Sequence, residues 1–96
     1  MLFRSFPVKG DRLGPPSVWA TIPGGHPDGM TLDAEGNVYV AMTDGHAIAI
    51  LNRSGDSIST IPTPGMFPTN VTFGGAGREV LFVTAASGGR VLRVRP

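Results

Sequence analysis

An internal repeat of roughly 40 residues constrains this chain more than any single segment does. The triplet Thr21-Ile22-Pro23, followed by Pro27, recurs as Thr60-Ile61-Pro62, followed by Pro68. Three later segments recur in the same order, namely residues 30–32 with 71–73, 38–41 with 81–84, and 47–50 with 91–94. Repeats of this length are typical of β-propellers, in which each repeat is a four-stranded blade.

Short strands separated by turns are predicted along the whole chain. The 96 residues include 14 glycines and 9 prolines, which divide short runs rich in Val, Ile, Phe and Thr. No helical period is sustained in any of these runs. We expect an all-β protein with about nine short antiparallel strands, at residues 2–7, 18–22, 29–32, 37–42, 47–51, 57–61, 70–73, 80–84 and 90–94.

The repeat divides the chain into three parts when strands are counted outward from the channel of a propeller. We expect residues 1–25 to supply the outer strands of one blade and residues 26–64 a complete blade. Residues 65–96 would then supply three strands of the next blade. A solenoid or a sandwich would also contain short strands, but neither explains the repeat length as well. The sequence therefore predicts part of a β-propeller.

Composition excludes several classes of function. The net charge is +1, and the arginines near the C-terminus are too few, without interleaved aromatic residues, for a nucleic-acid surface. No apolar stretch approaches the roughly 20 residues that span a bilayer, and no signal-peptide pattern is visible. Cysteine is absent, which excludes a disulfide framework and a thiolate metal site. We expect a soluble protein without nucleic-acid or membrane partners, in the cytoplasm by default.

Two segments resemble the SMP-30/gluconolactonase/luciferin-regenerating-enzyme family. The first is Pro27-Asp28-Gly29-Met30-Thr31-Leu32 with the following turn and strand, and the second is Phe73-Gly74-Gly75 with Leu81-Phe82-Val83-Thr84. Members of this family are six-bladed propellers that bind a divalent metal and mostly open lactones. The resemblance implies a partial six-bladed propeller that matches the last two-plus blades, and a gluconolactonase-like hydrolase acting on a small lactone.

The resemblance places two roles on Asp28. In the family, the Asp of the Pro-Asp-Gly-Met turn coordinates the metal and is the general base. Ca²⁺ is the metal that we expect, with other divalent ions as alternatives. The family's other ligands, a Glu and an Asn, lie in blades that this chain lacks, and Ca²⁺ takes about 6 to 8 oxygen ligands. Activity therefore requires other blades or subunits, and Asp28-Gly29 alone is also an ordinary turn pair.

Two further residues are candidates for substrate contact. His26 precedes the Asp28 turn and is placed to orient substrate or water, with an exposed loop histidine as the alternative. Asn70 takes the place of Asp28 or Gly29 in the next repeat, with a turn cap as the alternative. We expect a structural role in the following hairpin for Asp33, Glu35 and Asn37.

Incomplete blades leave strand edges unpaired, and such edges invite association. We expect a homo-oligomer in which subunits complete a ring around the lactone substrate. Three chains would make six blades, in which case residues 2–7 would lie outside the blade, unfold or force a different register. Two chains would make a four-bladed ring. Two other interpretations stay open, a non-catalytic module for self-association or ligand binding and an inactive truncated fragment.

Overall fold

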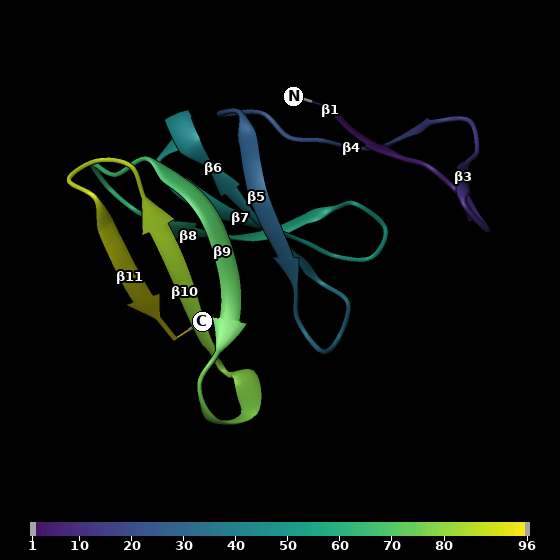
Figure 1. The fold of residues 1–96 in the computed structure, drawn as a ribbon. Coiled ribbons are helices and arrows are strands. Elements are labelled where there is room, and N and C mark those ends of the chain that lie inside the picture. Colours follow the sequence, from purple (N-terminus) through teal and green to yellow (C-terminus); the bar gives the residue numbers. More distant parts are fainter. Residues whose placement is uncertain (1, 96) are drawn as a thin grey trace.

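The computed structural model describes residues 2–95, which form antiparallel sheets set side by side (Figure 1). The first sheet pairs β1 (Leu2–Ser5) with β4 (Ser17–Thr21), and a small hairpin pairs β2 (Val8–Lys9) with β3 (Arg12–Leu13). The second sheet has the order β5 (Pro27–Leu32), β6 (Val38–Met42), β7 (Ala47–Leu51) and β8 (Ser57–Pro62). The third sheet has the order β9 (Pro68–Gly74), β10 (Val80–Ala85) and β11 (Arg90–Val94).

The described residues are almost all strand or turn, which confirms the all-β expectation. Their helical segments are two short 3-10 turns, η1 (Thr43–Gly45) and η2 (Ala76–Arg78). Within residues 2–95, no helix is both long and apolar enough to cross a membrane.

Two tight turns of the second sheet are built in the same way. Between β5 and β6, Oδ1 of Asp33 accepts the backbone N–H groups of the residues two and four positions later. Between β7 and β8, Oδ1 of Asn52 accepts the equivalent pair. The third position after each is a glycine, Gly36 or Gly55, with φ of 85° and 86°, a conformation that glycine adopts without strain. These turns set the register of both hairpins.

The two central strands of the second sheet, β6 and β7, are apolar on both faces because another sheet lies against each face. Along β6, Val40 and Met42 pack in one cluster with Phe3 of the first sheet. The alternate residue Tyr39 packs in a second cluster with Val71 of the third sheet. Successive side chains of a strand point to opposite faces, so a sheet covered on both sides has near-continuous apolar strands. Sheets stacked in this way are blades, and the chain forms part of a β-propeller.

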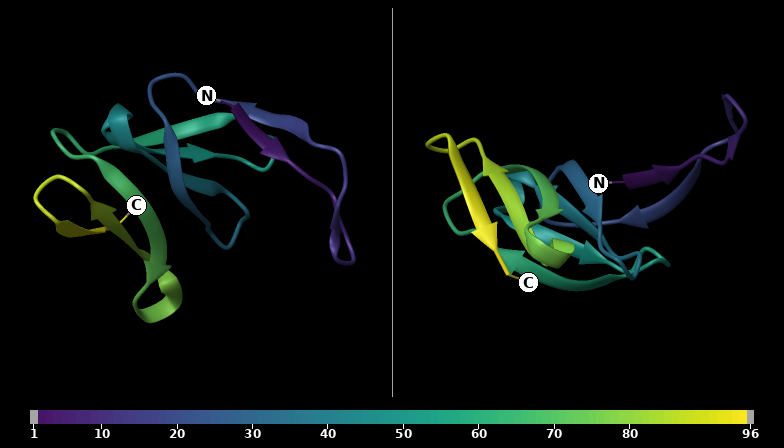
Figure 2. Two further views of the ribbon diagram at one scale, coloured as in Figure 1. Left: turned by 45° about the horizontal axis from the view of Figure 1, so that its top comes forward. Right: turned by 60° about the horizontal axis from the view of Figure 1, so that its bottom comes forward.

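The first sheet differs from the sequence prediction. The strand expected over residues 2–7 ends at Ser5, and the chain then forms the β2–β3 hairpin, which projects away from the sheets in Figure 2. The N–H of Gly14 donates to the carbonyl of Pro7 at 2.7 Å, which closes the base of this hairpin. The strand β1 pairs with β4, with Phe3 opposite Ala20. The inner edge of β4 is therefore occupied, and the open edge belongs to β1.

Candidate functional site

The first strands of the second and third sheets, β5 and β9, lie side by side (Figure 1). Both strands begin with matching β-bulges. In both pairings, with β6 and with β10, the register shifts by one residue near the initial proline. Alignment by register makes Asp28 the counterpart of Thr69, and Gly29 the counterpart of Asn70. Bulges of this kind re-aim side chains and are common next to functional sites.

Asp28 is exposed on the β5 bulge. The prediction of a tight turn at Asp28-Gly29 is wrong, because both residues lie within a strand and Gly29 is not among the glycines with positive φ. Close packing explains this glycine instead. A Cβ at position 29 would overlap the Asn70 side chain and lie 2.8 Å from the Asn70 Cα. Asp28 thus directly precedes the residue over which the Asn70 side chain packs.

The Asn70 side chain has one defined orientation. Its Oδ1 accepts the backbone N–H of Val71 at 2.9 Å, and this oxygen also packs over Gly29. Within residues 2–95, its Nδ2 has no hydrogen-bond partner. Asn70 is therefore a strand residue rather than a turn cap, and its amide N–H groups are donors open to a ligand oxygen.

His26 lies just before β5 and is held by Asp44 of η1. The ring Nδ1 of His26 is 2.6 Å from Asp44 Oδ2, and the His26 backbone N–H donates to Asp44 Oδ1 at 2.5 Å. The N–H of Thr43 donates to the His26 carbonyl at 3.1 Å. Both side chains stay accessible, with 67% of His26 and 51% of Asp44 exposed. The pair fixes the imidazole two residues before Asp28.

Asp44 is a functional candidate that the sequence reasoning missed. The hydrogen bonds from the backbone and the ring of His26 lower the pKa of Asp44 below 3.8, so this carboxyl is ionised at neutral pH. A carboxylate only accepts hydrogen bonds, so Nδ1 of His26 donates, and in the neutral imidazole Nε2 is the acceptor. Only the register between β5 and β6 could have identified Asp44. Met42 lies opposite Pro27, so η1, which follows Met42, lies next to His26, which precedes β5.

The polar hairpin after β5 has the structural role that we expected. Burial raises the pKa of Asp33, but hydrogen bonds from the side chain of Asn37 and from the backbone of Asn37, Glu35 and Gly36 outweigh it and lower the pKa below 3.8. The Nε of Arg53 donates to the Glu35 carbonyl at 2.9 Å, which ties this hairpin to the next turn. The Asp33 carboxylate is thus engaged by its own turn.

The described residues do not form a complete metal site. Among residues 2–95, no three His, Cys, Asp or Glu side chains lie close enough together to hold a metal. Asp28 offers the oxygen chemistry that Ca²⁺ prefers, but one carboxylate is far short of the about 6 to 8 oxygens that Ca²⁺ takes. A hollow of about 670 Å³ lies between the first and second sheets, and Asp28 is not among the residues that line it.

Comparison with known proteins identifies the family. Residues 3–87 match the SMP-30/Gluconolactonase/LRE-like region. The chain belongs to this family. The pentonolactonase of Haloferax volcanii is 34% identical to this SMP-30-like chain over 64 residues, which cover 67% of the chain and 22% of the relative.

Two solved structures share the fold of the SMP-30-like chain. A gluconolactonase from Xanthomonas campestris superimposes on 94% of the chain with a TM-score of 0.76 and 29% identity. A luciferin-regenerating enzyme superimposes on 97% of the chain with a TM-score of 0.81 and 26% identity. The chain covers 28% and 36% of these two proteins, so it spans a minor part of each relative. The family and the partial propeller predicted from the sequence are confirmed.

Proposed function

We propose that this chain is the part of a sugar-lactone hydrolase that contributes the catalytic carboxylate, Asp28. One observation supports this above all: the exposed residue Asp28 lies in the bulge of an inner strand, directly before the glycine over which the Asn70 side chain packs. The family adds to it, since similar proteins include a gluconolactonase and a pentonolactonase. A carboxylate placed in this way suits a general base for ester hydrolysis.

Each of three residues has a role in the proposed reaction. Asp28 takes a proton from a water whose oxygen attacks the lactone carbonyl carbon. The ring C–O bond then breaks, and Asp28 returns this proton to the leaving oxygen to give a hydroxy acid. Asn70 donates an amide N–H to a substrate oxygen. His26, held by Asp44, orients the substrate or the attacking water through Nε2.

The proposal includes a divalent metal, with Ca²⁺ as the first candidate. Asp28 would supply one oxygen ligand, and blades outside the described residues would supply the others. When bound, such a metal polarises the lactone carbonyl. The chemistry of Asp28 suits this metal, but the ligand set within residues 2–95 is incomplete, so activity depends on completion of the ring.

A homo-oligomer is one proposed source of the remaining blades, in which subunits complete a ring around the lactone. The pairing of β1 with β4 changes the register of such a ring. In a ring of identical subunits, β4 of one subunit would pair with β11 of the next and so complete its third sheet. Because β1 already pairs with the inner edge of β4, this is possible only if β1 separates from β4. A ring of three chains therefore requires rearrangement of the first sheet.

A non-catalytic module for self-association or ligand binding is the second candidate function. The incomplete metal site of residues 2–95 favours it. A chimeric enzyme separates the two candidates. Residues 3–87 replace the matched segment of the Xanthomonas gluconolactonase, and the rate of gluconolactone hydrolysis is measured by titrating the acid released at constant pH. The hydrolase proposal predicts turnover within about tenfold of the parent enzyme, equivalent to about 1.4 kcal/mol. A folded chimeric enzyme without turnover would support the non-catalytic module.

A further inference from the structure

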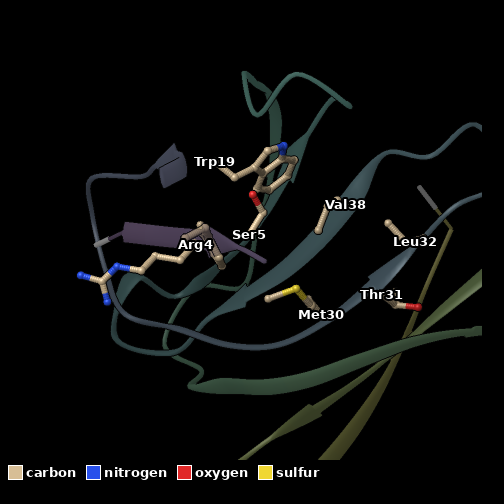
Figure 3. A pocket seen from close by; sticks show the side chains of 8 residues that line it. Arg4, Ser5, Trp19, Met30, Thr31, Leu32 and Val38 are labelled. Atoms are coloured by element: carbon tan, nitrogen blue, oxygen red, sulfur yellow. The ribbon is translucent and has the colours of Figure 1, made fainter. Parts of the chain in front are cut away.

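A groove of about 670 Å³ separates the first sheet from the inner strands of the second sheet (Figure 3). One wall is formed by β1 and by Trp19 of β4, and the other by Met30, Leu32 and Val38 of β5 and β6. The groove continues the apolar cluster that joins the two sheets, because Phe3, Trp19 and Val38 belong to both. The interface between these two blades is thus closed at its outer part and open at its inner part.

The exposed groove residues occupy positions that are covered in the next blade. By register, Met30 corresponds to Val71 and Leu32 to Phe73. Val71 is 5% exposed, whereas Met30 is 50% and Leu32 61% exposed. The second sheet makes this difference, since Tyr39 of β6 meets Phe73 edge to face with ring centroids 4.9 Å apart. No counterpart of β5 and β6 precedes β1 within the described residues to cover Met30 and Leu32.

The main chain of β1 offers a second attachment. Within residues 2–95, β1 pairs with β4 alone, so its other edge is open. In the complete second sheet, the equivalent third strand β7 pairs with β8 on one side and with β6 on the other. An open strand edge is a template for another strand. By analogy with β7, the strand that fits the open edge of β1 is the second strand of an inner hairpin.

We propose that this groove binds an antiparallel β-hairpin supplied by the polypeptide that carries the other blades of the propeller. The outer strand of the hairpin pairs with β1, and its apolar face covers Met30 and Leu32, with an aromatic side chain over Leu32 as Tyr39 lies over Phe73. A second copy of this chain fits less well. The sheet β9–β10–β11 of a second copy has three strands, and its outermost strand β11 would take the position in the blade that β1 already occupies. The inference does not depend on any catalytic role.

A fused hairpin tests the proposal within one chain. A second copy of residues 27–46, which contains β5, β6 and the turn that leads into β7, is placed directly before Leu2. Fusion gives the hairpin an effective concentration in the millimolar range. We expect a higher urea midpoint and slower hydrogen exchange at the β1 amides. We also expect a blue shift of the emission of Trp19, the only tryptophan in the chain.

The matched control changes Tyr39→Asp in the added copy alone, which places a charge over Leu32 and is expected to cancel all three effects. If the backbone amides of the added strands still exchange hydrogen rapidly and the Trp19 emission is unchanged, the proposal is wrong. If the fusion fails to fold, the synthetic peptide of residues 27–42 is titrated into the unmodified chain. A saturable Trp19 shift supports the proposal, and no shift at millimolar peptide counts against it.

Two substitutions in the chain locate the binding surface. Met30→Asp should weaken peptide binding at least about tenfold, because it places a charge in the covered groove. Ile58→Asp should have no effect, since Ile58 is equally exposed, at 53%, but lies on β8 away from the groove. If the unmodified chain is already a dimer that Met30→Asp dissociates and Ile58→Asp does not, a second copy fills the groove and the proposed source is wrong.

Discussion

The Asn70 side chain packs directly over Gly29, so that the bulges of two neighbouring inner strands interlock. A Cβ at position 29 would overlap the Asn70 carboxamide and approach the Asn70 Cα to 2.8 Å. The absence of a side chain at Gly29 therefore sets the distance between β5 and β9. It also sets where the amide group of Asn70 lies relative to the neighbouring Asp28.

The first prediction concerns this contact. Gly29→Ala should lower the free energy of unfolding by about 1–3 kcal/mol, the usual cost of overpacking, as measured by urea denaturation. Adding Asn70→Ala should recover part of this loss, because it removes the side-chain overlap but not the approach of the backbone. A Gly29→Ala variant as stable as the parent chain would show that the two strands are not packed as described.

The second prediction concerns the dependence of stability on pH. The pKa of Asp44 is lowered by hydrogen bonds from His26, so its ionised form stabilises the fold above the unfolded pKa of about 3.8. This contribution is lost as the pH falls through the lowered folded pKa. Asp44→Ala should therefore reduce the urea midpoint at about pH 6 and should have little effect below the folded pKa.

The matched control for Asp44→Ala is Asp11→Ala, because Asp11 is an exposed carboxylate with no hydrogen-bond partner within residues 2–95. It should change stability little at either pH. An equal loss at both pH values for Asp44→Ala would mean that its ionised form does not stabilise the fold.

The third prediction separates structure from catalysis in the hairpin after β5. Asp33→Ala should cost about 1 kcal/mol of stability, because three hydrogen bonds to a partly exposed carboxylate are lost. Glu35→Ala should cost little, because within residues 2–95 the hydrogen bonds of Glu35 are made by its backbone. Both variants should leave lactone turnover in the chimeric enzyme nearly intact. A large loss of turnover in either would move the active site to this hairpin.

The fourth prediction concerns metal binding by the isolated chain. Because the described residues offer one carboxylate at the proposed site, calorimetric titration with CaCl₂ should show no binding tighter than about 1 mM, whereas protein calcium sites with a full ligand set reach about micromolar affinity. Saturable micromolar binding that Asp28→Ala abolishes would show that the chain holds the metal without further blades.

Much of the fold could be predicted because propeller blades repeat in sequence. The apolar runs of β6 and β7 and the Gly-containing turns at Gly36 and Gly55 mark strands and their ends by local chemistry alone. The β2–β3 hairpin could not be predicted in this way. Its strands are two residues long, too short to show an alternating pattern.

The site was harder to predict because it depends on register across strands. Asp28-Gly29 has the composition of a turn, and only its pairing with β6 shows that it is a bulge. The His26–Asp44 pair joins residues 18 positions apart, and their contact follows from the position of η1 opposite the start of β5. Asn70 was found from the repeat, but the orientation of its amide depends on local hydrogen bonding.

Removal of the Asp28 carboxylate tests the central claim most directly. In the chimeric enzyme, Asp28→Ala should reduce kcat at least about 100-fold, the smaller end of the effect expected for a lost general base. The urea midpoint should barely change, because Asp28 is exposed. Turnover of gluconolactone at near the unsubstituted kcat, in a folded Asp28→Ala protein, would contradict the account.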